Sequence, residues 1–134
     1  MLKTGTIKQV DVFSCSPEEF YEAFLDSKKH SEFTGYKATG NAGKVNGRFF
    51  TNDVYSFGKT IKLTKNKLIV QEWTTTEWPE DYPPSIIKIA LKKKGNATEL
   101  TFIQTKVPLS QIKNYEGGWK TYYWAKMKKY FKKK

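Results

Sequence analysis

Residues that could carry out acid–base, nucleophilic or metal chemistry are scarce in this chain. It has one histidine, His30, and one cysteine, Cys15, which lie far apart in the sequence. Metal sites usually gather several histidine, cysteine or carboxylate ligands at short spacing, so we expect no metal. A thiol just before a helix can have a lowered pKa, but we interpret Cys15 as a small residue at a strand end and His30 as a surface or helix-packing residue. The sequence therefore predicts a protein without catalytic residues and without a cofactor.

Aromatic side chains are the more informative group, and they concentrate near the C-terminus. Between residues 117 and 131, large side chains recur at the i, i+3, i+4, i+7 and i+8 spacing of one helical face. This stripe consists of Trp119, Tyr122, Tyr123, Lys126, Met127, Tyr130 and Phe131. A helix with so wide an aromatic face needs a broad apolar surface to cover it, and the rest of the chain offers a sheet.

The elements that would position this helix begin with a strand over residues 4–13. Ser16, Pro17 and Glu19 then give a strong helix start, because serine caps, proline suits the first helical position and Glu19 completes a capping box. This helix runs to about residue 25. A second short helix follows over residues 28–33 and is closed by Gly35.

The rest of the chain alternates between apolar and polar residues, which is typical of strands. We expect strands over residues 47–51, 54–63, 67–75, 85–93 and 98–107. In the second of these, Tyr55, Phe57, Lys59, Ile61 and Leu63 occupy alternate positions and are expected on one face. The proline-rich segment 78–84 cannot be regular structure. A strand, two short helices, five or six antiparallel strands and a long final helix indicate an α+β fold.

The chain is strongly basic, and nearly all of its positive charge comes from lysine. It has 24 basic and 13 acidic residues, a net charge of +11, and Arg48 as its only arginine. Such charge attracts nucleic acid, anionic membranes or acidic proteins, or simply forms a solvated surface. Because arginine dominates base and phosphate recognition, we expect no specific nucleic-acid binding.

The chain has neither an apolar run long enough to span a bilayer nor a secretory signal, so we expect a cytoplasmic protein. We also expect a monomer, folded as one domain over residues 1–134.

The element order matches the helix-grip fold of the START-like (SRPBCC) superfamily, in which a curved antiparallel sheet surrounds a long C-terminal helix. Within that superfamily, the motifs resemble those of the C-terminal domain of the activator of heat shock protein 90 ATPase and its single-domain relatives. The segments that carry the resemblance are Ser16-Pro17-Glu18-Glu19-Phe20-Tyr21-Glu22-Ala23, His30 with Phe33-Thr34-Gly35, Gly47-Arg48-Phe49, Gly58, Leu63, Ile69-Val70-Gln71-Glu72-Trp73, Trp78-Pro79, Thr98-Glu99-Leu100, Gln104, Val107-Pro108, Gly118-Trp119 and Tyr123-Trp124. They extend over nearly the whole chain, in the order that the family has.

Two positions depart from the family pattern. The family often has Asp-Gly where this chain has Asp53-Val54, so the turn geometry is expected to differ. The family often has arginine where this chain has Thr74, which would remove a charge partner from the groove. The full activator also carries a separate N-terminal domain for which this chain has no room, so we expect any chaperone stimulation to be small.

The resemblance implies two functions. The first is a non-enzymatic regulator of the ATPase of heat shock protein 90, and the second is a carrier or sensor that binds a small apolar ligand between sheet and helix. Nucleic-acid binding through the lysine-rich final helix is weaker, because no reading motif is present. An enzyme of the cyclase or hydratase kind sometimes built on this fold has no catalytic residues here to support it.

The helix-grip fold also implies which residues would surround the groove between sheet and final helix. The candidates are Phe33, Tyr36, Phe49, Tyr55, Gln71, Trp73, Trp78, Gln104, Trp119 and Tyr123. Aromatic walls with a few polar groups bind small apolar molecules, and Gln71 and Gln104 could supply the polar handles. The same aromatic residues could instead fill a packed core, and the sequence leaves both possibilities open.

Overall fold

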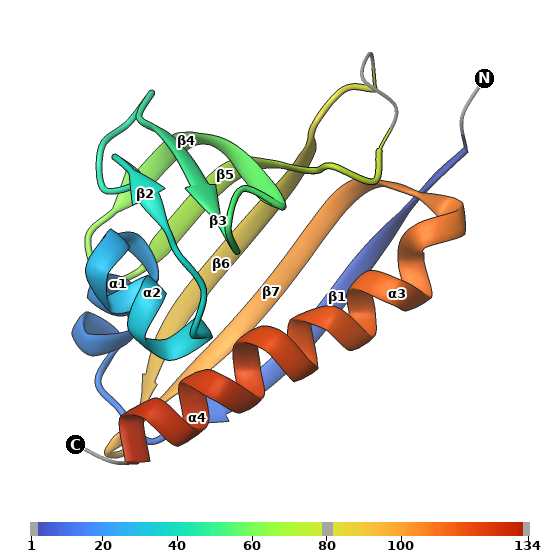
Figure 1. Cartoon of the computed structure of the whole chain (residues 1–134). Helices are drawn as coiled ribbons and strands as arrows, with labels where there is room; N and C mark the ends of the chain where they lie inside the picture. Colours follow the sequence, from blue (N-terminus) through green and yellow to red (C-terminus); the bar gives the residue numbers. More distant parts are fainter. Residues whose placement is uncertain (1–2, 79–81, 133–134) are drawn as a thin grey trace.

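The structure, a computed structural model, describes residues 3–78 and 82–132. The strands are β1 (Thr4–Phe13), β2 (Thr39–Gly40), β3 (Arg48–Thr51), β4 (Ser56–Thr64), β5 (Leu68–Thr75), β6 (Ser85–Lys94) and β7 (Ala97–Pro108). The helices are α1 (Pro17–Leu25), α2 (Ser27–Thr34), a short 3₁₀ turn (Leu109–Gln111), α3 (Ile112–Gly118), a π-helical segment (Trp119–Trp124) and α4 (Ala125–Lys132). The expected irregular loop 78–84 lies between β5 and β6, and its residues 79–81 are outside the described ranges. The predicted α+β class and helix-grip arrangement are confirmed (Figure 1).

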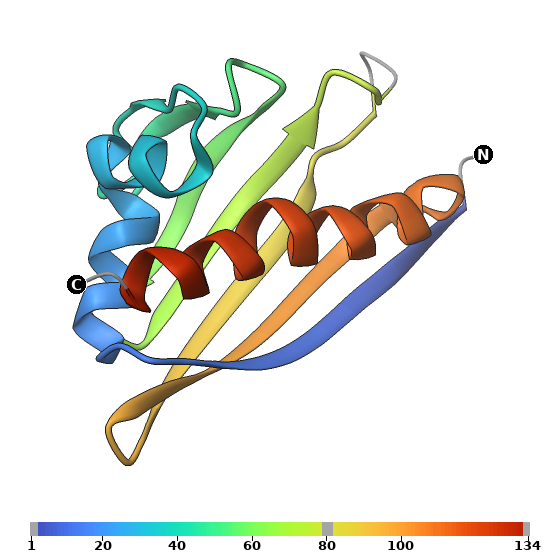
Figure 2. The ribbon, with the colours of Figure 1, turned by 60° about the horizontal axis from the view of Figure 1, so that its bottom comes forward.

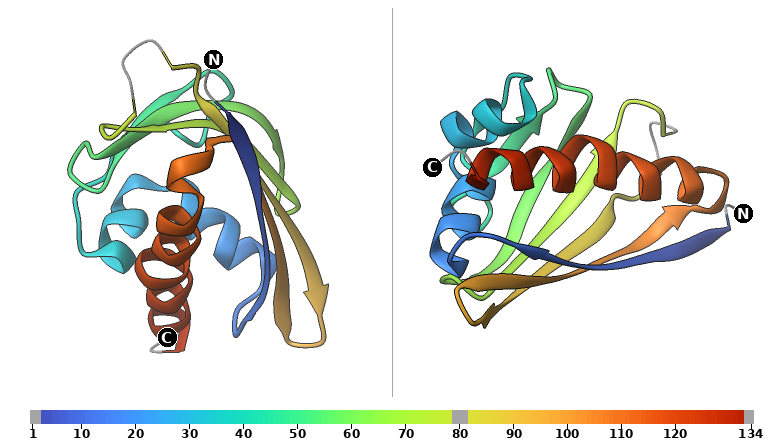
Figure 3. Two further views of the ribbon diagram at one scale, coloured as in Figure 1. Left: turned by 90° about the vertical axis from the view of Figure 1, so that its right-hand side faces the viewer. Right: turned by 90° about the horizontal axis from the view of Figure 1, so that it is seen from below.

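The strands of the described residues form one antiparallel sheet in the order β1-β7-β6-β5-β4-β3-β2. Figures 2 and 3 show that this sheet curves around the C-terminal helix, which lies along its concave face. The two short helices cover the end of that face near the C-terminus of the chain. β2 was not predicted, because a strand of two residues, paired with Phe49 and Phe50 of β3, has no alternation to detect.

The start of α1 follows from local side-chain chemistry. The backbone N–H of Glu19 donates to Ser16 Oγ at 3.1 Å, and the Ser16 N–H donates to Glu19 Oε1 at 2.9 Å. These two bonds are the predicted capping box, and Pro17 occupies the first turn. The helix α2 ends at Gly35, whose φ of 80° lies in the left-handed region that glycine reaches without strain. Both predicted helices are therefore confirmed.

The strand β4 faces the core with small polar side chains. Ser56 and Thr60 are buried, whereas Ile61 is 38 % exposed. The pairing register with β5 shifts between Thr60 and Lys62, and this bulge brings Leu63 against the core. The expectation that Tyr55 to Leu63 place alternate residues on one face is therefore wrong at Leu63, because the bulge turns this residue to the core side of the strand.

The C-terminal helix begins five residues before the predicted residue 117, at Ile112, and changes its winding in the middle. At the end of the π-helical segment, the N–H of Ala125 donates to the Lys120 carbonyl, five residues back. The wider turn places Trp119, Tyr123 and Trp124 on the buried side together. The predicted stripe is thus wrong at two positions: Tyr122 is 51 % exposed, and Trp124, which the stripe omitted, is 2 % exposed.

Aromatic contacts join the helix to the sheet at the centre of the core. The Trp119 ring lies 4.5 Å from Phe102 of β7 and 5.2 Å from Trp73 of β5, between ring centroids. Trp119 also stacks on Trp124, at 5.4 Å with 18° between the ring planes. Among the described residues, no helix has the length and apolar character that a bilayer span requires.

Candidate functional site

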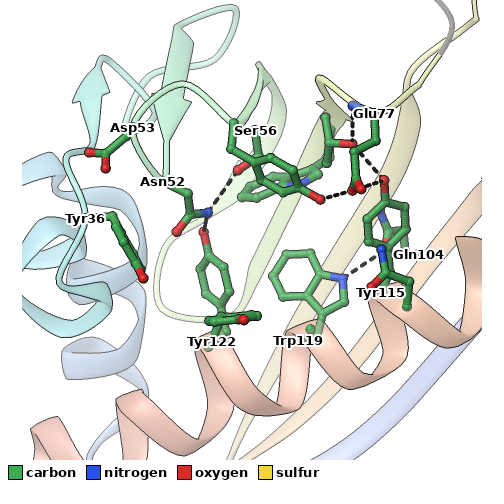
Figure 4. A pocket seen from close by; sticks show the side chains of 15 residues that line it. Tyr36, Asn52, Asp53, Ser56, Glu77, Gln104, Tyr115, Trp119 and Tyr122 are labelled. Atoms are coloured by element: carbon green, nitrogen blue, oxygen red, sulfur yellow. Dashed lines mark hydrogen bonds between the residues drawn. The ribbon is translucent and has the colours of Figure 1, made fainter.

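A cavity of about 420 Å³ lies between the sheet and the C-terminal helix. Its walls come from the segment after α2, the β3–β4 turn, the end of β5, β7 and the helix, as Figure 4 shows. The lining residues are Tyr36, Asn52, Asp53, Tyr55, Ser56, Trp73, Thr75, Glu77, Gln104, Asn114, Tyr115, Gly118, Trp119, Tyr122 and Tyr123. This volume is in the range of cavities that hold small molecules.

Six of the ten groove candidates line this cavity and four do not. The lining includes Tyr36, Tyr55, Trp73, Gln104, Trp119 and Tyr123. Phe33, by contrast, packs on His30 and Tyr123 at the α2 end. Phe49 packs on the Trp73 ring, with the two centroids 5.4 Å apart. Both phenylalanines therefore serve the packed core, as the sequence left possible.

The other two candidates outside the cavity are Gln71 and Trp78, and each donates a side-chain hydrogen bond. Gln71 is buried, and its Nε2 donates to Thr60 Oγ1 at 3.2 Å. Its Oε1 has no hydrogen-bond partner among the described residues. The adjoining void of about 10 Å³ is far too small for a ligand. The Trp78 indole donates to the Tyr115 hydroxyl at 2.6 Å, so Trp78 supports the cavity wall from behind.

At one end of the cavity, a buried hydrogen-bond chain joins three elements. Asn52 Nδ2 donates to the Tyr123 hydroxyl at 3.0 Å, and that hydroxyl lies 2.9 Å from His30 Nε2. His30 Nδ1 lies 2.8 Å from the Phe24 carbonyl oxygen, which can only accept, so Nδ1 carries the proton and Nε2 accepts from Tyr123. Burial lowers the pKa of His30 to about 4. His30 is 3 % exposed and neutral, which confirms helix packing and excludes the surface alternative.

At the opposite end, two phenols converge on a carboxylate. The Tyr55 and Tyr115 hydroxyls both donate to Glu77 Oε1, the second at 3.4 Å. The Tyr115 hydroxyl also lies 2.7 Å from Thr75 Oγ1. Burial, followed by the hydrogen bond to Glu77, raises the pKa of Tyr55, and burial raises the pKa of Tyr115. Both phenols therefore keep their protons near neutral pH and act as donors.

The back of the cavity is fixed by a relay from helix to sheet. The Trp119 indole donates to Gln104 Oε1 at 2.9 Å, and Gln104 Nε2 donates to Ser85 Oγ at 2.9 Å. Ser85 Oγ in turn donates to the Trp73 carbonyl at 2.7 Å. Gln104 is thus a buried polar group that orients the Trp119 ring, with both of its amide atoms satisfied.

The rim of the cavity is a strained turn. Asn52, Asp53 and Val54 have φ values of 53°, 56° and 69°, and a β-branched residue such as Val54 rarely adopts such a conformation. The Asp53 carboxylate accepts from the Lys37 N–H at 2.8 Å, and the Asp53 N–H donates to the Lys37 carbonyl at 3.0 Å. These two bonds hold the segment that carries Tyr36 against the turn.

The second departure from the family pattern, Thr74, does not affect the cavity. Thr74 lies on the face of β5 opposite to that of Trp73 and Thr75, both of which line the cavity. The expectation that Thr74 removes a charge partner from the groove is therefore wrong, because position 74 points away from it.

Sequence reasoning missed nine lining residues. These are Asn52, Asp53, Ser56, Thr75, Glu77, Asn114, Tyr115, Gly118 and Tyr122. Tyr115 carried a usable signal, since it precedes Trp119 by one helical turn and the predicted helix began too late to include it. Across residues 3–78 and 82–132, no group of three or more histidine, cysteine or acidic side chains could hold a metal ion. The arrangement is one that could enclose a small molecule.

A curved antiparallel sheet that grips a C-terminal helix over a lined cavity defines a START-like protein. The family model described as "Activator of Hsp90 ATPase homolog 1-like protein" matches residues 14–132, and the chain belongs to this family.

Two curated relatives and one solved structure illustrate the relationship. The human protein named activator of 90 kDa heat shock protein ATPase homolog 1 is 30% identical over 130 residues, which cover 97% of this chain and 38% of the relative. A Dictyostelium discoideum homologue of that activator is 28% identical over 120 residues, covering 87% of this chain and 30% of the relative. The chain thus spans less than two fifths of either relative. The crystal structure of an HSP90 activator from Plasmodium falciparum has a TM-score of 0.77 at 22% identity, covers 87% of each chain and shows the same fold.

Proposed function

We propose that this chain is a non-enzymatic regulator that binds a chaperone of the Hsp90 class and modulates its ATPase. The observation that carries the proposal is the 30% identity to the human activator, which extends over 97% of this chain. Under this proposal the protein works as a monomer in the cytoplasm, where its single cysteine stays reduced.

The surface of the C-terminal helix supports binding to an acidic partner. Its exposed lysines are Lys113, Lys120, Lys128, Lys129 and Lys132. Among the described residues, only Lys128 of this set pairs with a carboxylate, that of Asp11 at 2.7 Å. The other four lysines of this exposed set are therefore available to a negatively charged surface, and such contacts raise association rates in a salt-dependent way.

The proposal is tested by measuring binding of the purified chain to a purified Hsp90 at several salt concentrations. Reversing two helix charges, with Lys120→Glu and Lys129→Glu together, should weaken the complex at least about tenfold. The matched control is Lys92→Glu with Lys93→Glu, which makes the same change in net charge on the β6–β7 hairpin. Equal loss in both variants would indicate a general charge effect, and no complex with the unaltered chain would refute the proposal.

A second candidate function is the binding of a small molecule, and the cavity favours it. Its volume of about 420 Å³ and its aromatic walls, including Trp73 and Trp119, suit a ligand of modest size. Titration of candidate ligands should quench or shift the tryptophan emission, because two of the four tryptophans line the cavity. A flat titration across neutral, cationic and anionic aromatic compounds would count against this candidate.

A further inference from the structure

The charge of the cavity is opposite to that of the chain. The chain has 24 basic residues against 13 acidic ones, yet the part of the cavity wall formed by the described residues contains no lysine, arginine or histidine. It contains two carboxylates, Asp53 and Glu77. The chain as a whole has a net charge of +11, but a cavity lined by carboxylates is poorly suited to an anionic ligand such as a fatty acid.

Glu77 is the carboxylate whose charge is available to a ligand. The ion pairs of the described residues engage Glu22, Glu99 and Asp11, and none engages Glu77. Its partners are the Tyr55 and Tyr115 hydroxyls, which are neutral donors. These hydrogen bonds fix the carboxylate in place without neutralising it, so its negative charge faces the cavity. Figure 4 shows Glu77 on the same side of the cavity as Tyr115 and Gln104.

The aromatic rings at the other end already hold a cation. Lys126 Nζ lies 4.9 Å from the centroid of the Tyr36 ring and 5.6 Å from that of the Tyr122 ring, and it donates to the Thr34 carbonyl at 2.7 Å. Figure 4 shows Tyr36 and Tyr122 away from Glu77. A ligand cation would therefore avoid the Lys126 end and lie near Glu77, where the rings of Tyr55, Tyr115 and Trp119 offer further faces.

We infer that the cavity selects a cationic ligand, an aromatic or alkyl ammonium whose charged group lies beside Glu77 and whose apolar part contacts Trp119 and Trp73. This inference rests on the second candidate function above, since it requires that the cavity binds a small molecule. The positive charge of the chain as a whole does not prevent it. The Debye length is about 8 Å at physiological ionic strength, so surface lysines beyond that distance are largely screened, whereas Glu77 acts at contact.

The test uses three probes that share a phenylbutyl group and differ in charge: 4-phenylbutyltrimethylammonium, 4-phenylbutanol and 4-phenylbutyrate. Each is titrated into the full chain by tryptophan fluorescence at pH 7 and 150 mM salt. We expect the ammonium to bind at least about tenfold more tightly than the carboxylate, with the alcohol between them. The variant Glu77→Gln keeps an acceptor for the two phenols, and it should weaken the ammonium about tenfold while leaving the alcohol unchanged.

The matched control is Glu72→Gln, which also removes one negative charge. Glu72 lies on the face of β5 that points away from the cavity, so this change should leave all three affinities unchanged. Equal affinities for ammonium and alcohol, or tighter binding of the carboxylate, would overturn the cationic inference while keeping the cavity as a ligand site. Failure of all three probes to bind would overturn the ligand-binding candidate and this inference together. Should Glu77→Gln fail to fold, the ranking of the three probes on the unaltered chain decides.

Discussion

Removing the Tyr123 hydroxyl is the sharpest test of the buried network at the Asn52 end of the cavity. This hydroxyl accepts from Asn52 Nδ2 at 3.0 Å and donates to His30 Nε2 at 2.9 Å. In Tyr123→Phe the ring remains, so packing against Trp119 and Phe24 is kept and no large void forms. What is lost is the polar link between α2, the β3–β4 turn and the helix.

The magnitude follows from which partners are left without a bond. His30 Nε2 becomes a buried acceptor with no donor, at a cost of about 1–3 kcal/mol. Asn52 loses less, because its amide still donates to Ser56 Oγ at 2.9 Å and the residue is half-buried. We therefore expect Tyr123→Phe to lower the free energy of unfolding by about 2 kcal/mol, which for a domain of this size lowers Tm by about 6–8 °C.

The assay is urea unfolding at pH 7 of four chains: unaltered, Tyr123→Phe, His30→Leu and the double variant. If Tyr123 and His30 are hydrogen-bonded, the coupling free energy should be about 1–2 kcal/mol. Once one of the two partners has been replaced, replacing the other breaks no further hydrogen bond between them. The control is Tyr122→Phe on the same helix, because the Tyr122 side chain is 51 % exposed at the rim of the cavity, and its expected change is below about 0.5 kcal/mol. Additive single effects, or equal losses at positions 122 and 123, would refute the reasoning.

Further predictions concern pH and backbone geometry. Burial lowers the pKa of His30 to about 4 in the folded chain, whereas an unfolded histidine titrates near 6.5. The unfolded state therefore gains the proton first as pH falls, and stability should decline between about pH 6.5 and 4 by up to about 3 kcal/mol. Urea titrations should show a smaller decline in this window for His30→Gln, and parallel curves would contradict the assignment. Val54→Gly should raise the unfolding free energy by up to about 1 kcal/mol, because the residue has a φ of 69°; a lower Tm would count against strain at this turn. Gly58→Ala should cost more than about 2 kcal/mol, since its Cβ would lie 1.8 Å from the Glu72 carbonyl oxygen, whereas Gly117→Ala, with open space around it, should be neutral or stabilising. Calorimetry of this glycine pair checks the prediction, and similar melting temperatures would contradict it.

The elements that sequence reasoning predicted well are those with local signals. The capping box of Ser16 and Glu19 and the left-handed Gly35 fix the ends of two helices within a few residues of chain. Long alternating segments likewise predicted β5, β6 and β7, because each buries one face. What local patterns do not encode is a change of period. The bulge after Thr60 and the π-helical turn around Trp124 each add a residue where tertiary packing favours it.

The cavity was predictable in part for the same reason. Trp73 and Trp119 belong to the periodic faces of regular elements, so their position in the groove followed from the fold. Glu77 and Asn52 come from connections between strands, where only the folded chain decides which way a side chain points. The sequence anticipated Gln104 as a polar group of the cavity, but the negative charge of the cavity emerged only from the structure, and with it the expectation of a charged ligand.

The measurement that tests the central claim most directly is the ATP turnover of a purified Hsp90 as this chain is added, with an Hsp90 inhibitor used to subtract background hydrolysis. Regulation through the helix surface predicts a change in rate that saturates with the concentration of the chain. It also predicts that the change is strongly reduced in the Lys120→Glu and Lys129→Glu double variant and kept in the Lys92→Glu and Lys93→Glu control. A turnover rate that stays constant at all concentrations, with no complex detected under the same conditions, would contradict the account.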